Sequence, residues 1–300
     1  MTRKIQVYQV DAFTRTQFTG NPAGVVLSAD RLDDAEMLAI ARELNNADTA
    51  FILAPDGTDH EVRAKFFTPR VEAGFVGHAT VAAHYVLSRR RTHFERLRQK
   101  SKAGIVDIDV RGTGDDRRIA IRQPRPPVGR ELNDRERLAV LDALALATDD
   151  IDLRCPIRIA GSSSTRLMVG VRTPEQLKTL KPDTARLTTL SAQLGAAGYF
   201  IFTLAPTDPE CFTESRMFCP ALGIPEDPVS GNAHGLLGAY LAECKLLEHD
   251  GKRATFRGQQ GHHLHRPGRV EVELEFENGH IDGVWIIGQA VSIFETEITL

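Results

Sequence analysis

Two helices that open on glycine are the segments of this sequence best suited to bind an anion. One opens at Gly77, in Gly-His-Ala, and the other at Gly231, in Gly-Asn-Ala. The first N–H groups of a helix lack partners within it and form the positive end of its dipole, and glycine lets a ligand approach them closely. Facing each other between two domains, these N-termini could bind a small carboxylate, or both could be ordinary helix starts buried in each domain core.

Both helices belong to a longer repeated motif. Lys65–Pro69 (KFFTP) is matched 151 residues later, Phe to Phe, by Arg216–Pro220 (RMFCP). An acidic residue then stands five positions before each helix-opening glycine, Glu72 in the first copy and Glu226 in the second. In each copy a strand, a proline turn and an acidic residue precede the helix. The repeat predicts that the two halves of the chain are structural copies of each other.

Other segments with reactive side chains have simpler interpretations. The run 161–164 (GSSS) lacks the GxSxG elbow of a serine nucleophile, so we expect a loop bordering the site. His262, His263 and His265 resemble a metal-binding tract but have no carboxylate pair nearby, so a loop or strand edge is expected and no metal. Neither helix carries GxxxxGK[ST] or follows GxGxxG, which leaves nucleotide binding without support.

A basic cluster lies between Ser88 and Lys102. It holds seven Lys or Arg residues, Arg91 among them, against the single acid Glu95. It follows the end of a helix, where cations complement the dipole. We expect a solvated surface rather than a nucleic-acid site, since the formal net charge of the chain is −3.

Length and composition describe an ordinary water-soluble chain. It has 300 residues, 42% of them hydrophobic and 26% charged, which suggests about two domains and a sizeable core. No apolar run approaches the roughly 20 residues of a membrane span, and the N-terminus has no apolar signal core. The four cysteines show neither CxxC nor zinc-ligand spacing, so we interpret them as reduced thiols of a cytoplasmic protein.

The apolar pattern predicts mixed strands and helices. Expected strands cover 5–13, 23–27, 49–53, 61–67, 105–110, 118–122 and 199–204, positions near 157 and 167, and parts of 269–300. Expected helices cover 32–44, 77–87, 134–146, 187–194 and 231–247, with a turn at 20–24 (GNPAG). The proline-rich stretch 123–130 is a candidate linker. The domains are therefore predicted as 1–122 and 123–290, with 291–300 a last strand that could return to the first domain.

Several segments resemble the phenazine-biosynthesis PhzF-like family, and most of all its YddE branch. They are VDAFTRTQFTGNPAGVVL, ARELNNADTAF, FFTPRVEAGFVGHATVAAHYVL, SRMFCPALGIPEDPVSGNAHGLLGAYL and GQQGHHLHRPGRV, and the resemblance runs from about Val7 to the last strand. It implies an α+β fold of the diaminopimelate epimerase type. In that fold two pseudo-symmetric domains, each a curved β-sheet wrapped around a central helix, hold the active site between them, as the internal repeat also suggests.

The resemblance assigns roles to residues of this chain. Asp48 stands where the family places an acid/base glutamate, and Ala47 replaces the usual serine. The implied catalytic residues are Asp48, His78 and Asp227, and the implied substrate-binding residues are Gly77, Ser230, Gly231 and Asn232. In the phenazine enzyme the equivalents bind a dihydro-hydroxyanthranilate and move a proton between ring carbons. Other members of the fold carry a cysteine before each helix; here those places are assigned to Val76 and Val229, which excludes a two-thiol mechanism.

The sequence therefore predicts an isomerase that needs no cofactor. It would shift a proton on a small cyclic or amino/hydroxy carboxylic acid, as trans-2,3-dihydro-3-hydroxyanthranilate isomerase does, through one carboxylate whose pKa burial raises toward the working pH. We expect a small carboxylate as partner, no nucleic acid or membrane, and, from the family, a homodimer. The alternative is a carboxylate-binding protein or a catalytically lapsed relative. An aspartate is one methylene shorter than glutamate, and a misplacement of about 1 Å can cost about a hundredfold in rate.

Overall fold

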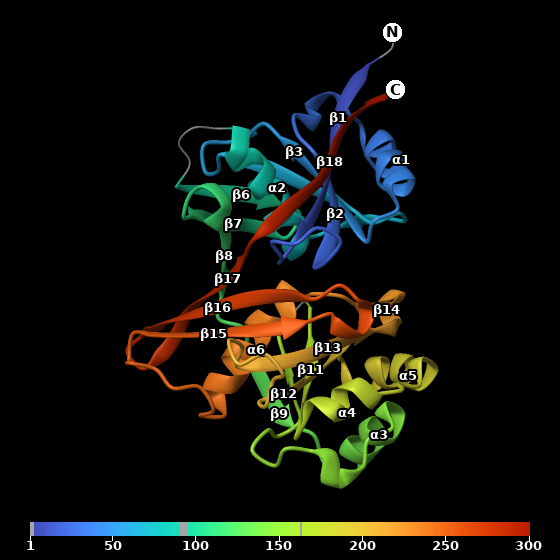
Figure 1. Ribbon diagram of the computed structural model, residues 1–300, viewed down its shortest axis with the longest axis vertical. Helices are drawn as coiled ribbons and strands as arrows, with labels where there is room; N and C mark the ends of the chain where they lie inside the picture. The colour runs from blue at the N-terminus through green and yellow to red at the C-terminus, as the bar shows by residue number, and fades with distance from the viewer. Residues whose placement is uncertain (1–2, 91–94, 163) are drawn as a thin grey trace. The chain divides into compact units, whose positions relative to one another are not determined.

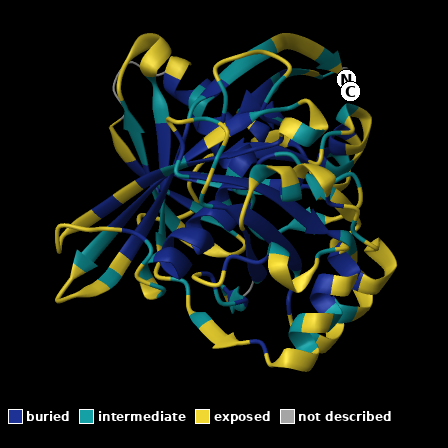
Figure 2. Cartoon of the chain, turned by 60° about the horizontal axis from the view of Figure 1, so that its bottom comes forward, coloured by how far each residue is buried: buried dark blue, intermediate teal, exposed yellow. Residues whose placement is uncertain are grey.

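The computed structural model describes residues 3–90, 95–162 and 164–300, and the chain divides into two compact units (Figure 1). The first unit comprises Met1–Arg122 and Ile287–Leu300, and the second comprises Gln123–Ile286. Figure 2 shows buried residues filling the interior strands, while loops and hairpin tips are exposed.

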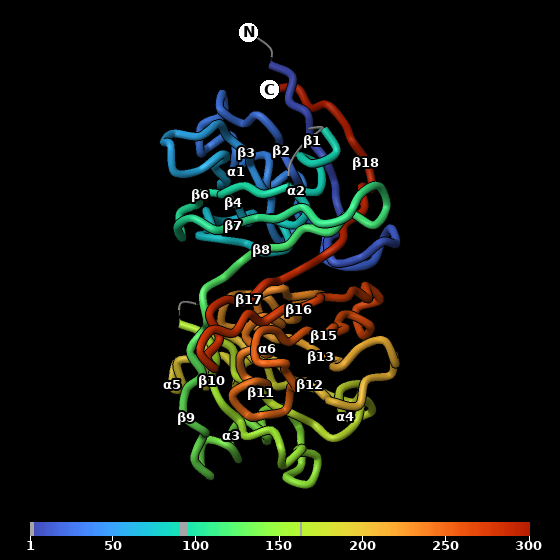
Figure 3. Tube along the Cα trace, turned by 90° about the vertical axis from the view of Figure 1, so that its left-hand side faces the viewer, coloured from blue at the N-terminus to red at the C-terminus, as the bar shows by residue number. Residues whose placement is uncertain are grey.

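The first unit is built on a mixed β-sheet. Its strands pair in the order β18 (Ala290–Thr299), β1 (Lys4–Ala12), β2 (Asn21–Val26), β3 (Asp48–Leu53), β4 (Val62–Phe67), β6 (Arg96–Ser101), β7 (Gly104–Arg111) and β8 (Arg118–Pro124). The pairs β2–β3 and β4–β6 are parallel and the others antiparallel. The short β5 (Glu72–Ala73) pairs with β4. The last strand of the chain thus returns beside the first, as Figure 3 also shows.

Helices cover both faces of β3 in this unit. Helix α1 (Asp34–Leu44) begins with a capping box between Asp33 and Glu36, and α2 (Gly77–Arg90) is buried along most of its length. Single 3₁₀ turns lie at η1 (Ala29–Arg31) and η2 (Gly114–Asp116). All six residues of β3 are buried, and Phe51 packs into the cluster formed by α1. Because side chains alternate along a strand, Asp48 lies on the opposite face, toward α2.

The second unit repeats this design. Its strands pair in the order β9 (Val128–Glu131), β10 (Arg158–Ala160), β11 (Arg166–Val171), β12 (Gly198–Thr203), β13 (Thr213–Cys219), β15 (Arg253–Gln260) and β16 (Gly268–Glu277), followed along the chain by β17 (His280–Gly288). The pairs β11–β12 and β13–β15 are parallel, and β14 (Ile224–Asp227) pairs with β13.

The helices of the second unit also lie on two faces of its central strand. On one face are α3 (Asp134–Leu144), α4 (Pro174–Thr179) and α5 (Thr184–Leu194), whose apolar residues share a core cluster with Tyr199 and Ile201 of β12. The other face meets α6 (Gly231–Glu243), where Phe200 lies edge-to-face against His234 at 5.2 Å between ring centroids. Short 3₁₀ turns occur at η3 (Thr148–Asp150), η4 (Pro220–Leu222) and η5 (His262–Leu264).

The two units share one succession of strand pairings. Strands β1, β2, β3, β4 and β6 correspond to β10, β11, β12, β13 and β15, with the same parallel and antiparallel relations. Helices α2 and α6 occupy the same place in this succession, between β5 and β6 and between β14 and β15. The α+β class with two similar halves is therefore confirmed.

Some element boundaries differ from those predicted. Residues 21–24 are not a turn, because β2 begins at Asn21 and the reversal ends at Gly20, whose φ is +65°. Helix α6 ends at Glu243 rather than near 247, since Lys245 adopts a left-handed conformation. The short helix α4 was not predicted from the sequence.

The candidate linker and the basic cluster are more ordered than expected. Strand β8 runs to Pro124 and β9 begins at Val128, so only 125–127 lie outside strands. Prolines are tolerated there because strand ends need fewer N–H donors. The basic cluster contains β6, whose two most buried residues are Leu97 and Gln99. A strand with so little apolar character gives no clear period in the sequence.

A buried ion pair ties β13 to β14 and α4. The Arg216 guanidinium donates two hydrogen bonds to Glu226, at 2.9 and 2.8 Å, and one of 2.8 Å to the carbonyl of Leu177. Both side chains of the pair are about nine-tenths buried. Glu226 is the acidic residue of the repeated motif, whereas in the first copy Lys65 and Glu72 pair with Asp34 and Lys102 instead.

We expect Glu226→Gln to destabilise the protein by about 3 kcal/mol, because it leaves the Arg216 charge buried without a counter-ion. Urea denaturation measures this loss. Asp142→Asn, which breaks the exposed pair with Arg186, should cost less than about 1 kcal/mol. Equal losses in the two variants would contradict the assigned importance of the buried pair.

Candidate functional site

Asp48 and His78 come together in the first unit. Asp48 is the first residue of β3 and His78 the second residue of α2. The carboxylate Oδ2 lies 3.8 Å from the imidazole Nε2, and the side chains are only 13% and 10% exposed. Within the described part of the chain, His78 Nε2 is buried without a hydrogen-bond partner. A buried polar atom left unsatisfied costs stability, so a catalytic role or a bound water or ligand is one explanation for it.

The backbone of α2 presents free donors beside this pair. The Thr80 N–H bonds to the carbonyl of Val76 at 2.9 Å, which makes Val76 the residue before the first helical turn. The N–H groups of Gly77 and His78 therefore precede the first intrahelical bond. A side chain built at Gly77 would meet nothing within 4 Å, so this helix start is not covered by packed protein atoms.

Burial sets the charge state of His78. It lowers the pKa of the imidazole from 6.5 to about 4, because the charged form loses its solvation. His78 is therefore neutral at pH 7, with one ring nitrogen able to donate and the other able to accept a proton. A neutral imidazole beside a carboxylate can relay a proton to or from it.

The second group of candidate residues forms the turn that opens α6. Ser230 caps the helix, its side chain accepting a hydrogen bond of 3.2 Å from the Ala233 N–H. The Asn232 amide donates to the carbonyl of Ser164 at 3.4 Å, so Ser164 borders this turn as expected, whereas Ser163 lies outside the described residues. Asp227 ends β14, three residues before the cap.

This geometry corrects one assignment. The residue directly before α6 is Ser230, whose carbonyl accepts from the His234 N–H as that of Val76 accepts from Thr80. The position equivalent to Val76 is therefore Ser230 and not Val229, because Val76 and Ser230 each stand directly before the glycine that opens the helix. A serine is not a thiol, so neither position carries a cysteine.

The second unit has no counterpart of Asp48. Thr49 pairs with Phe67 and Tyr199 pairs with Phe218, which places Gly198 where the first unit has Asp48. A Cβ at Gly198 would lie 2.3 Å from the Cys219 sulfur and 3.0 Å from a backbone oxygen. No side chain fits there, so the carboxylate of the repeated fold is present on one side only.

Two further polar features support these segments, and sequence analysis gave neither a role. The Gln260 side chain bonds to the backbone of the turn before α6, and it stands in the GQQG segment. The Gln9 and Asn46 side chains exchange two hydrogen bonds, at 2.9 and 2.8 Å, and so anchor the chain two residues before Asp48. The one available signal was that Asn46 and Gln260 stand in segments that resemble the family.

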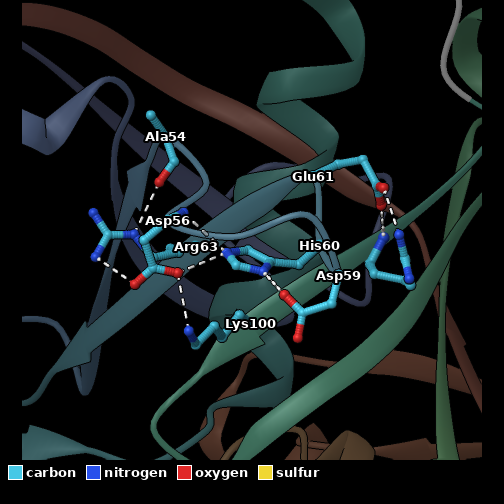
Figure 4. A network of polar contacts seen from close by, with 8 residues as sticks. Ala54, Asp56, Asp59, His60, Glu61, Arg63 and Lys100 are labelled. Atoms are coloured by element: carbon cyan, nitrogen blue, oxygen red, sulfur yellow. Dashed lines mark hydrogen bonds and ion pairs between the residues drawn. The ribbon is translucent and has the colours of Figure 1, made fainter.

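A second polar cluster, shown in Figure 4, is occupied by its own ion pairs. His60 is buried between Asp59, at 2.7 Å, and Asp56, at 3.0 Å. Asp56 also binds Lys100 and Arg63, at 2.9 and 3.2 Å. The carboxylate of Asp56 is therefore neutralised by Lys100 and Arg63 of the same unit, and that of Asp59 contacts His60. These contacts hold the loop between β3 and β4 in place.

The remaining reactive segments also have structural partners. In the basic cluster Arg96 pairs with Asp109, Arg98 with Glu61 and Lys102 with Glu72, and Arg91 lies outside the described residues. Of the three histidines at 262–265, His262 and His263 lie in the 3₁₀ turn η5, and His265 follows directly after it. Among the described residues no three His, Cys, Asp or Glu side chains could hold a metal ion. No helix of the described ranges is long and apolar enough to cross a membrane.

Comparison with known proteins defines the class. A family model described as phenazine biosynthesis-like protein matches residues 10–296, and the chain belongs to this PhzC–PhzF family. An uncharacterized isomerase YddE of Salmonella typhimurium is 42% identical over 298 residues, covering 98% of each chain. A PhzF family protein of Bacillus anthracis matches with a TM-score of 0.88 and 29% identity over 99% of each chain. A predicted epimerase of Pseudomonas aeruginosa matches with a TM-score of 0.81 and 27% identity, covering 98% of this chain and 99% of that one.

These findings confirm the predicted family and the predicted enzyme class, an isomerase. The roles of the individual site residues stay predictions.

The buried histidines should make stability fall at mildly acidic pH. Burial lowers the pKa of both His78 and His234 to about 4, so between about pH 6.5 and 4 the unfolded chain binds more protons than the folded one. Each histidine should reduce the free energy of unfolding by up to about 1.4 kcal/mol per pH unit as the pH falls through this window.

Urea titrations at several pH values test this dependence. His78→Asn and His234→Asn should each lower the slope, whereas the exposed His280→Gln should leave it unchanged. A slope unaffected by either buried-site variant would refute the assignment.

Proposed function

We propose that this protein moves a proton between two atoms of a small cyclic or amino/hydroxy carboxylic acid, with Asp48 as the only acid/base carboxylate. The observation that carries the proposal is the contact between Asp48 and His78, together with the absence of room for a carboxylate at Gly198. A substrate resembling trans-2,3-dihydro-3-hydroxyanthranilate is the first candidate, because the family is that of phenazine biosynthesis-like proteins.

The reaction begins when Asp48 removes a proton from a substrate carbon. The electron pair left behind is delocalised into the conjugated system or the carboxylate of the substrate. The N–H groups at the starts of α2 and α6, at Gly77, Gly231 and Asn232, bind the substrate carboxylate and the developing negative charge. Asp48 then returns the proton to a second carbon, so no electrons are gained or lost overall.

His78 and Asp227 assist this transfer. The neutral His78 imidazole can exchange a hydrogen bond with the protonated Asp48 or with a polar group of the substrate, since its Nε2 has no other partner among the described residues. Asp227 is proposed to bind an amine or hydroxyl of the same substrate. Ser230 fixes the start of α6. The proposed reaction takes place in the cytoplasm, where the four thiols would stay reduced.

Replacing Asp48 should abolish most of the activity. Asp48→Asn removes the base and should lower kcat by about 10²- to 10⁴-fold. The assay is deuterium incorporation from D₂O into dihydro-hydroxyanthranilate and into common amino acids, followed by mass spectrometry.

Asp142→Asn, an exposed change, serves as the control and should keep full activity. Equal exchange by wild type and Asp48→Asn would refute the role of Asp48. Carboxylate binding without any exchange, unaffected by Asp48→Asn, would instead identify a carboxylate-binding protein.

A single carboxylate also predicts the stereochemistry. Deuterium should enter on the face from which the proton leaves, because the same Asp48 carboxylate removes and returns the proton. Chiral chromatography and proton NMR of the exchanged product measure this. Progressive racemisation of a chiral substrate would mean that a second base acts from the other face.

A further inference from the structure

One buried side chain bridges the turn that opens α6. Gln260 is the last residue of β15 and is 1% exposed. Its Nε2 donates a hydrogen bond of 2.6 Å to the carbonyl of Asp227, and its Oε1 accepts one of 3.1 Å from the N–H of Ser230. The amide nitrogen and the amide oxygen of Gln260 thus both bond to the backbone of one four-residue segment, 227–230.

The position of this carboxamide determines how wide the turn is. In a closed β-turn the first carbonyl accepts directly from the N–H three residues later. Here those two groups, the carbonyl of Asp227 and the N–H of Ser230, are joined through the amide of Gln260 instead. The turn is therefore held open by the length of one carboxamide. A glutamine suits this place because a single planar group supplies one donor and one acceptor.

The next residue closes the other side of the turn. Gly261 has a φ of +93°, and a Cβ there would lie 2.7 Å from the carbonyl oxygen of Pro228. The backbone of 260–261 thus packs directly against the middle of the turn, which any larger residue would displace.

In the first unit the turn before α2 is held by a different contact. The pairing of β4 with β6 and of β13 with β15 places Ser101 at the position of Gln260. The turn before α2 is held there by a backbone bond of 3.3 Å, from the Ala103 N–H to the carbonyl of Gly74. Among the described residues, the side chain at this position bonds to the backbone of the turn in the second unit.

We propose that Gln260 is a positioning residue, which holds the Asp227–Ser230 turn open so that Ser230 and the first N–H groups of α6 bind the substrate carboxylate. The proposal rests on the proposed function for the identity of the ligand. Gln260 itself contacts no substrate and acts through the backbone of the turn.

Amide hydrogen exchange tests the two hydrogen bonds between Gln260 and the turn without any substrate. In Gln260→Met, of similar size but without donor or acceptor, the Ser230 N–H should exchange about 10-fold faster. In Gln260→Glu the carboxylate still accepts from Ser230, so its protection should be kept. Gln259→Met is the matched control, since Gln259 is equally buried on the same strand but bonds to Thr207 and Glu214. Unchanged exchange at Ser230 in Gln260→Met would overturn the proposal.

Steady-state kinetics test the positioning role. Gln260→Met should raise KM about 10-fold and lower kcat by a smaller factor, while the pH profile of kcat stays unchanged because Asp48 and His78 are untouched. Gln260→Glu should not restore KM, because it cannot donate to Asp227 and adds a negative charge near the bound anion. Gln259→Met should keep the wild-type KM.

The outcomes separate the two proposals. If Ser230 loses protection but KM stays constant, Gln260 is structural and the positioning role is wrong. If the wild-type protein exchanges no substrate, the proposed function fails. In that case the binding of 3-hydroxyanthranilate, measured by calorimetry, replaces KM as the readout, and equal affinity in wild type and Gln260→Met refutes the positioning role.

Discussion

The burial of one helix along the inner face of each sheet is the constraint on which the rest of the structure depends. A helix packed against strands on several sides must be lined by small residues. Helix α2 accordingly carries Ala79, Ala82 and Ala83, while α6 carries Gly235 and Gly238, where added methyl groups would press against neighbouring strands. The side walls of such a helix are fully used for packing, so its ends are where polar backbone groups lack a helical partner.

The shared scaffold carries different chemistry in its two halves. The first unit brings a carboxylate and a neutral imidazole together, at Asp48 and His78. The second has Gly198 and Asn232 at the corresponding places, and its turn is held by Gln260. The two halves therefore carry different side chains at equivalent places, although they share the same succession of strand pairings.

Local patterns predicted most elements but not all of them. Strongly apolar strands such as β3 and β12, and helices with regular spacing such as α1 and α3, were found within a few residues. Strand β6 was missed because its charged residues are paired with acids distant in sequence, which neutralise a segment that looks like a solvated run. Residues 21–24 were misjudged because Gly and Pro indicate a turn, whereas the neighbouring strands extend β2 through them.

By itself the sequence determined the duplication, the two glycine-opened helices, the family and the identity of the candidate residues, because these depend on residue types and spacing along the chain. Only the tertiary structure decided that Asp48 faces His78 and that Gly198 leaves no room for a second carboxylate. It also revealed the role of Gln260, 30 residues after the turn that it holds. These facts depend on strand register and on hydrogen bonds between distant segments, which no local pattern encodes.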